Sequence, residues 1–192
     1  VFDVSECGYA YRKSIFKEEW RGRYAVTHVH FRLSSTFRPN LDYGGIREAL
    51  SAGGIRPEEV TAQDLRRVVI AIRKAKLPDP KVQGNAGSFF MNPVVSREVY
   101  EAIKGDYLDV PRYEVDAERV KIPAGWLIER CGWKGRSLGR AAVHDRQALV
   151  LVNKGGATGR DILALCEAIR ADVLSRFGIS ITPEVNIIGG CA

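Results

Sequence analysis

Two prolines, Pro78 and Pro80, follow directly after a segment with a strong helical pattern, and they constrain the fold more than any other feature. A residue that precedes a proline is pushed out of the helical region, so the connection here must be extended. Before it, Thr61 and Asp64 have the spacing of a capping box, and apolar residues then recur at helical spacing. The sequence therefore predicts a helix over 62–75 that ends at an extended hinge, which we interpret as a domain boundary.

Helices and strands alternate irregularly after the hinge, which indicates the α+β class. Ser96 is expected to cap a short helix that buries Val99, Tyr100 and Ile103 and ends at Gly105. The other predicted elements are a helix from Ala124 to Cys131, a buried strand over 148–152, a helix that Thr158 and Asp161 begin and Gly178 ends, and an edge strand over 179–188 that Pro183 interrupts.

Two segments are predicted from weaker signals. Apolar and polar residues alternate over 24–33, which is the period of a half-buried strand. The segment Gly84–Ser88 has glycines on both sides of two small residues and is expected to form a glycine-rich turn.

The formal net charge of +6 suits an anionic partner. No run of Lys and Arg occurs, and aromatic residues do not alternate with basic ones, so a phosphorylated small ligand is favoured over nucleic acid. No apolar run reaches the roughly 18 residues that a membrane-spanning helix needs. The first residues contain no initiator methionine and no targeting signal. We expect a piece of a longer cytoplasmic protein with free thiols at Cys7, Cys131, Cys166 and Cys191.

Several side chains have both a functional and a structural interpretation. Ser88 is either open to a ligand or part of a tight turn, and Glu184 lies either in a site or on the solvent face of an edge strand. Tyr11 and Arg12 suit a carboxylate ligand, or they form a surface pair.

The histidines and one glycine-rich loop are weaker candidates. His28 and His30 have the spacing of a metal pair but no evident third ligand, so no metal is expected. His144 is either a general base or a hydrogen-bonded loop residue. The loop 153–159 lacks the order of a phosphate-binding loop and is expected to be a turn and a helix cap.

Six motifs occur in a fixed order along the chain: Tyr11-Arg12-x-Ser14, residues 76–81, residues 84–93 (Gly-Asn-Ala-Gly-Ser-Phe-Phe-x-Asn-Pro), residues 124–128, residues 142–144 and residues 183–185. Taken together, these motifs resemble the MurB family of bacterial peptidoglycan synthesis, the UDP-N-acetylenolpyruvoylglucosamine reductases. The order and spacing match along essentially the whole chain, and the region 41–44 with the region 124–142 resembles the type I branch.

The resemblance implies a reductase (UDP-N-acetylmuramate dehydrogenase) in which NADPH reduces bound FAD. The flavin N5 then passes hydride to C3 of the enolpyruvyl group of UDP-N-acetylglucosamine enolpyruvate, and protonation at C2 gives UDP-N-acetylmuramate. It implies that Ser88 donates the proton and that Arg12 and Glu184 complete the catalytic set. The sugar-nucleotide ligands that it implies are Tyr11, Tyr43, Lys76, Asn92, Tyr113, Lys134 and Gln147.

The resemblance also implies a domain organisation. Residues 1–76 correspond to the closing portion of the FAD-binding domain, residues 77–178 to the complete substrate-binding domain, and residues 179–192 to the strand that returns to the first domain. Most of the family's FAD site precedes these residues. The implied protein is a cytoplasmic monomer that serves cell wall biogenesis, cell shape and cell division in the cell cycle, with no nucleic-acid or membrane partner. The alternative is a non-catalytic sugar-nucleotide-binding module without flavin.

Overall fold

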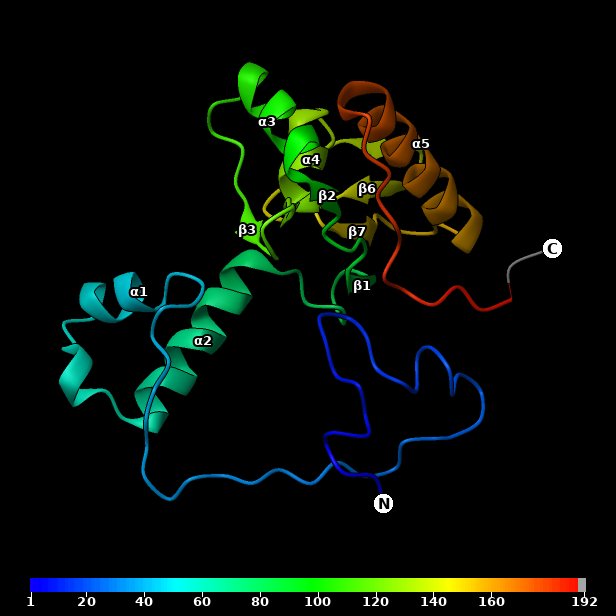
Figure 1. Ribbon diagram of the computed structural model, residues 1–192. Coiled ribbons are helices and arrows are strands. Elements are labelled where there is room, and N and C mark those ends of the chain that lie inside the picture. Colours follow the sequence, from blue (N-terminus) through cyan, green and yellow to red (C-terminus); the bar gives the residue numbers. More distant parts are fainter. Residues whose placement is uncertain (190–192) are drawn as a thin grey trace. The chain divides into compact units, whose positions relative to one another are not determined.

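A computed structural model describes residues 1–189, which form two compact units (Figure 1). The first unit is residues 1–38, which consist of turns, bends and unpaired segments without a helix or strand. Its packing centres on the rings of Phe2, Phe16, Trp20 and Tyr24, whose neighbouring centroids lie 4.9–5.9 Å apart. A bridge between Ala10 and Lys13 closes a tight turn.

The strand predicted over 24–33 is wrong. This segment is extended but unpaired within the described residues, and its apolar side chains are exposed, among them Phe31 at 79% and Leu33 at 84%. A strand needs a neighbour that bonds its N–H and C=O groups and covers one face. The alternation therefore marks a potential strand that finds no partner in this part of the molecule.

The second unit begins with a helical hairpin formed by α1 (Ile46–Ala52), a 3₁₀ helix (Pro57–Glu59) and α2 (Ala62–Lys76). The capping box is confirmed, because Thr61 Oγ1 accepts from the Asp64 N–H and the Asp64 carboxylate accepts from the Thr61 N–H, both at 3.1 Å. The helix ends at Leu77, where the backbone becomes extended. The predicted helix and the extended exit from it are both confirmed.

Two antiparallel sheets follow α2 in the described residues, and the α+β class is confirmed. The four-stranded sheet has the order β1-β7-β6-β5 and consists of β1 (Asn85–Ser88), β7 (Val150–Asn153), β6 (Ala141–Val143) and β5 (Ser137–Leu138). The three-stranded sheet has the order β2-β4-β3 and consists of β2 (Val94–Ser96), β4 (Arg119–Lys121) and β3 (Tyr113–Glu114).

The segment Gly84–Ser88, predicted as a turn, is mostly strand β1. It pairs with β7 through Asn85 opposite Val152 and Ser88 opposite Val150, with an irregular register between these pairs. Gly87 lies in this irregularity with a φ of +72°, a conformation that glycine adopts without strain. The glycine-rich composition thus permits a bulged edge strand where the sequence had indicated a turn.

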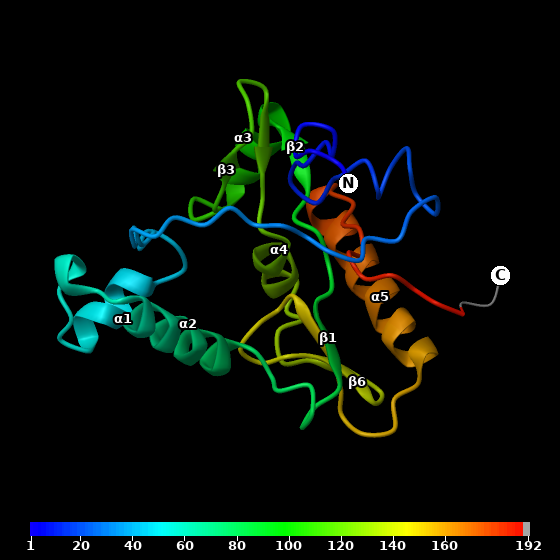
Figure 2. The same cartoon turned by 90° about the horizontal axis from the view of Figure 1, so that it is seen from below.

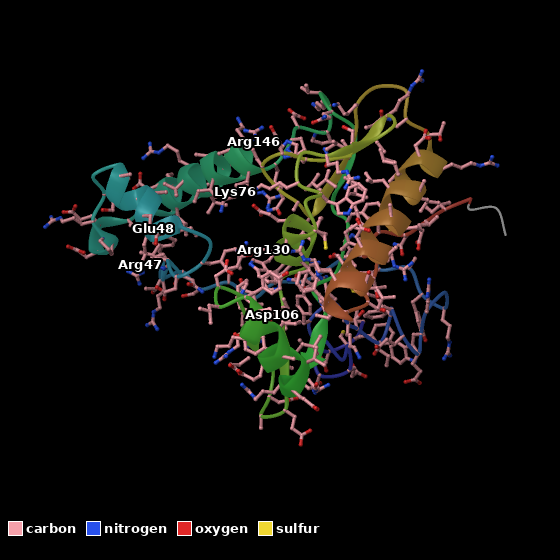
Figure 3. The ribbon with its side chains drawn as sticks, turned by 90° about the horizontal axis from the view of Figure 1, so that it is seen from above. Arg47, Glu48, Lys76, Asp106, Arg130 and Arg146 are labelled. Carbon is pink, nitrogen blue, oxygen red and sulfur yellow. The ribbon has the colours of Figure 1, made fainter. Side chains whose placement is uncertain are left out.

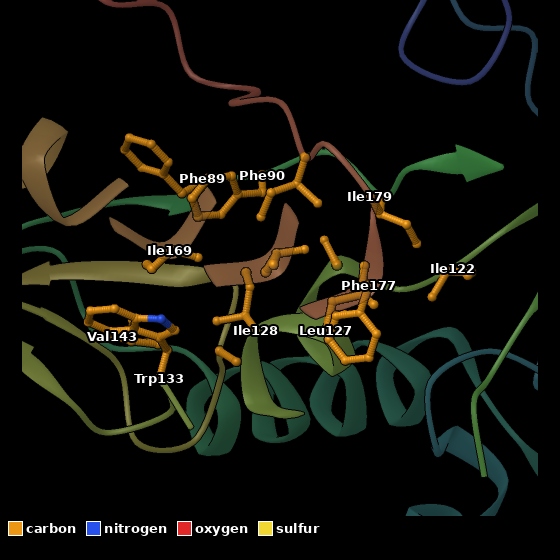
Figure 4. Close-up of a cluster of buried hydrophobic side chains, with 14 of the residues drawn as sticks. Phe89, Phe90, Ile122, Leu127, Ile128, Trp133, Val143, Ile169, Phe177 and Ile179 are labelled. Atoms are coloured by element: carbon orange, nitrogen blue, oxygen red, sulfur yellow. The ribbon is translucent and has the colours of Figure 1, made fainter. Parts of the chain in front are cut away.

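Three helices complete the main core, which is shown in Figure 4: α3 (Arg97–Asp106), α4 (Ala124–Arg130) and α5 (Gly159–Phe177). Figure 2 shows α5 alongside the sheet, and its buried side chains, such as Leu165 and Ile169, join those of α4 and β6 in one cluster. The second capping box, Thr158 with Asp161, and the closing Gly178 are confirmed. No helix among residues 1–189 has the length and apolar composition to cross a membrane.

The opposite face of the four-stranded sheet carries a small second cluster. Ala142, Val150 and Val152 are buried there, and Leu77 packs against them. The residue that follows α2 is therefore fixed to the sheet beside the strand that carries Ser88.

Three predicted details of the remaining elements are wrong. Val99 is 38% exposed, and α3 continues past Gly105 to Asp106. The segment 179–188 forms no regular strand, only a bridge between Pro183 and Phe90. Proline lacks the N–H that a continuous ladder requires, so the pairing is confined to the residues around it.

Candidate functional site

Ser88 ends the edge strand β1 and is exposed. Its register partner Val150 belongs to the face that also carries Leu77. Paired residues of an antiparallel ladder share a face, so the Ser88 side chain is on this face as well. The next residue, Phe89, turns into the core and donates its N–H to the Leu149 carbonyl at 2.7 Å, which fixes the end of the strand.

Glu184 lies beside the end of this strand although 96 residues separate it from Ser88. The Glu184 N–H donates to the Phe89 carbonyl at 2.8 Å, and the Met91 N–H donates to the Thr182 carbonyl at 2.9 Å. Glu184 is half-buried, which agrees with neither a fully solvated nor a fully inserted carboxylate. The structure thus brings the backbone of Glu184 next to Phe89, the residue that follows Ser88.

Asn92 and Gln147 meet at the start of α4. Asn92 Oδ1 accepts the Ala124 N–H at 2.9 Å, an orphan donor of the first helical turn. Gln147 Oε1 accepts the Leu149 N–H at 3.3 Å and would lie 3.6 Å from a Cβ atom placed on Gly125. Both predicted ligand residues therefore also have a structural role.

A groove of about 910 Å³ lies on the same side of the sheet as Ser88. Its lining includes the basic side chains of Arg73, Lys74 and Arg146, the buried His144, and the backbone of Gly87. Lys76, a predicted ligand, is exposed at the end of α2, and Figure 3 labels it together with Arg146. Sequence reasoning missed Arg73, Lys74 and Arg146, because nothing in their local pattern separates them from ordinary surface cations.

The other predicted ligands of the second unit lie on separate elements. Tyr113 is exposed on β3 with Lys121 Nζ 5.4 Å from its ring centroid, and Lys134 Nζ pairs with Glu129 Oε1 at 2.9 Å after α4. Tyr43 is 79% exposed in the loop before α1. The structure does not gather these three residues with Ser88 through any described contact.

Tyr11 and Arg12 belong to residues 1–38 and form the tip of the turn closed by Ala10 and Lys13. Arg12 has a φ of +60°. Among the described residues, it is the only one other than glycine with a positive φ. Such a conformation costs an arginine free energy and is often found at functional positions. The Arg12 guanidinium carbon lies 5.6 Å from the centroid of the Tyr11 ring.

A network of ion pairs supports the strand that carries Tyr113. Arg97 and Arg112 both bond the Glu114 carboxylate, at 2.6 and 2.7 Å. The Arg97 guanidinium, with a smaller contribution from Arg112, holds the pKa of Glu114 below its ordinary value. Glu114 therefore stays ionised in mildly acidic solution.

The remaining sequence candidates have structural roles. Asn153 Oδ1 accepts from the N–H groups of Gly155 and Ala157, so the loop 153–159 is a turn and a helix cap, as predicted. The described residues contain no group of three or more His, Cys, Asp or Glu that suits a metal ion. Cys7, Cys131 and Cys166 are free thiols, and Cys191 lies outside the described residues.

Together, the fold and this geometry define an α+β domain with a groove that has basic side chains in its lining, on the face of the sheet that also carries Leu77. A family model described as UDP-N-acetylenolpyruvoylglucosamine reductase, C-terminal domain, matches residues 79–188, and the chain belongs to this family. The predicted MurB resemblance is therefore confirmed.

Named relatives are similar over almost the whole chain. The UDP-N-acetylenolpyruvoylglucosamine reductase of Bacteroides fragilis is 58% identical over 188 residues, which are 98% of this chain and 55% of that protein. The protein of the same name from Burkholderia cenocepacia is 54% identical over 183 residues, which are 95% of this chain and 52% of that protein. The chain thus spans about half the length of the curated relatives it matches.

Proposed function

We propose that this chain forms the substrate side of a reductase that converts UDP-N-acetylglucosamine enolpyruvate to UDP-N-acetylmuramate. The observation that carries the proposal is the hydrogen bond from the Glu184 N–H to the Phe89 carbonyl, because it joins Glu184 to the strand of Ser88. The family membership of residues 79–188 and the names of the relatives support the same reaction.

In this proposal, Ser88 protonates C2 of the substrate after hydride has reached C3. A serine hydroxyl is a weak acid, so neighbouring groups must stabilise the charge that develops on the enol and must exclude water. Glu184 is proposed to assist from the adjacent segment, and Arg12 to bind the enolpyruvyl carboxylate through its guanidinium. The exposed position of Ser88 at a strand end leaves its hydroxyl accessible to a substrate.

The sugar nucleotide is proposed to bind along the second unit. Lys76 and Lys134 are cations suited to its diphosphate. Asn92 Oδ1 accepts the Ala124 N–H, and the side-chain NH₂ group of Asn92 is proposed to donate to the ligand. Tyr11, Tyr43, Tyr113 and Gln147 complete the proposed set. The Lys134–Glu129 ion pair is exposed and therefore weak, so a phosphate competes with it readily.

FAD and NADPH are the proposed cofactors. The groove that Gly87 lines is the proposed place of one edge of the flavin, because Arg73, Lys74 and Arg146 offer donors and positive charge to its electron-rich carbonyl side. Bound flavin supplies the hydride. The residues of this chain contribute the cationic wall, the proton donor and the substrate contacts.

We further propose the domain organisation that the resemblance implies, with residues 1–76 closing a FAD-binding domain, residues 77–178 binding substrate and residues 179–192 returning to the first domain. The last of these ranges extends beyond the described residues. The proposed protein acts as a monomer in the cytoplasm, in the synthesis of peptidoglycan precursors.

Ser88→Ala in the full-length protein tests the proposal. Hydride transfer, followed as reoxidation of reduced flavin by the substrate, should persist, whereas formation of UDP-N-acetylmuramate should fall by at least about a hundredfold. Ser96→Ala is the matched control, because Ser96 caps α3 and takes no part in the proposed chemistry. Near-normal product formation by Ser88→Ala would exclude Ser88 as the proton donor.

A further inference from the structure

The connection between β6 and β7, residues 144–149, is a tight turn closed by a histidine. The His144 N–H donates to the Val150 carbonyl at 2.9 Å, and the Val150 N–H donates to the Gln147 carbonyl at 3.0 Å. Inside the turn, His144 Nδ1 accepts the Arg146 N–H at 3.2 Å. One imidazole thus bonds the backbone that leads from the sheet to Gln147.

These contacts define the form of the His144 ring. Because Nδ1 accepts from a backbone N–H, it carries no proton, and the neutral ring holds its proton on Nε2. Nε2 lies 3.4 Å from Asp145 Oδ1, while the side chain as a whole is only 6% exposed. The buried imidazole thus stabilises the turn through its Nδ1 acceptor. An alanine or an apolar ring at this position would leave the Arg146 N–H without that acceptor.

The far end of this turn carries Gln147, which packs against the first turn of α4. Leu149 and Gln147 would contact a Cβ atom on Gly125 at 3.4 and 3.6 Å, so the turn and the helix fit closely. Asn92 holds the first N–H of the same helix. The position of Gln147 relative to Asn92 therefore depends on how the turn is held.

His144 is also in register with the proposed proton donor. The His144 N–H bonds the Val150 carbonyl and Ser88 is the register partner of Val150, so His144, Val150 and Ser88 follow one another in one row across the sheet. Val150, the middle residue of this row, is fully buried. A positioning role, and not direct proton transfer, follows from this arrangement.

We propose that His144 is a positioning residue for the sugar-nucleotide site, and that the bond from the Arg146 N–H to its Nδ1 fixes Gln147 for contact with the substrate. This inference rests on the proposed function, which assigns Gln147 to the substrate. It adds a residue that acts through the turn and touches neither the substrate nor the reacting atoms.

The test compares two variants of His144 in the full-length protein by calorimetric titration with UDP-N-acetylglucosamine enolpyruvate. His144→Phe keeps a ring but removes the acceptor, and it should weaken binding about tenfold, as expected for the loss of one buried hydrogen bond. His144→Asn should restore most of the affinity, because an asparagine oxygen readily accepts from the N–H two residues later.

A double variant shows whether the effect passes through Gln147. His144→Phe combined with Gln147→Ala should bind no more weakly than Gln147→Ala alone, because two residues that act through one contact are not additive. In turnover, the KM should rise while kcat changes less than twofold. Wild-type affinity in His144→Phe, or additive losses in the double variant, would overturn the proposal.

Amide hydrogen exchange separates this inference from the proposed function. If His144 holds the turn, His144→Phe should lose protection at the Arg146 N–H and His144→Asn should keep it. A wild-type protein that does not bind the substrate would refute the proposed function, and with it the role of Gln147 in binding. Unchanged protection of Arg146 in His144→Phe would refute the anchoring role itself.

Discussion

The region 77–189 and the region 1–38 differ sharply in how their apolar patterns are used. In the region 77–189, side chains such as Leu127 and Ile169 are completely buried. In the region 1–38, all of whose residues are described, only Cys7 and Ser14 are buried. Both regions contain periodic apolar residues. An apolar pattern stabilises a fold only where another element covers it, so the two regions must differ in stability and in tolerance of substitution.

The largest expected effect is in the main core. Leu127→Ala should lower the free energy of unfolding by about 2–5 kcal/mol, because it removes fully buried methyl groups and leaves a cavity. Leu33→Ala, at a residue that is 84% exposed, should change it by less than about 0.5 kcal/mol. Urea unfolding followed by circular dichroism measures both, and equal effects would contradict the contrast between the regions.

A smaller effect is expected where a ligand residue also supports the fold. Asn92→Ala should cost about 1–2 kcal/mol of stability, because the Ala124 N–H, in a residue without exposed surface, loses its acceptor. Asn92→Asp keeps an acceptor and should retain most of that stability. Thermal unfolding separates the two variants, and a stable Asn92→Ala would show that the bond to α4 is unimportant.

The smallest effect concerns the ion pairs beside Tyr113. The pKa of Glu114 is lowered from 4.5, so its contribution to stability is present above that pH and is lost as the pH falls through the lower folded value. Glu114→Gln should therefore reduce stability near neutral pH and flatten its decline below pH 4.5. High salt should shrink the difference, because the pairs are exposed. Acid-unfolding curves that run parallel for the wild-type protein and Glu114→Gln would refute the stabilising role of the Glu114 carboxylate.

Local signals predicted the elements that depend on local physics. Thr61 and Thr158 are followed three residues later by aspartate, and both helices begin there. The strand predicted over 24–33 is wrong because no described residue pairs with it, and β1 was missed because pairing with β7 overrides a glycine-rich composition.

The site shows the same division between local and long-range information. The family resemblance supplied Ser88 and Glu184, and in the structure the residues next to them, Phe89, Phe90 and Pro183, take part in one bridge with Glu184. The bond of Asn92 to α4 was not predicted, and the hydrogen-bonded alternative for His144 did not identify its partner, the Arg146 N–H. The first depends on a contact over 32 residues and the second on the fold of the β6–β7 connection.

The visible absorbance spectrum of the full-length protein, recorded with and without UDP-N-acetylglucosamine enolpyruvate, tests the proposed reductase most directly. We predict a flavin band that shifts when the sugar nucleotide is added, because substrate bound beside Ser88 changes the surroundings of the flavin. A protein that binds the sugar nucleotide but has no flavin band would contradict the reductase and favour the non-catalytic binding module.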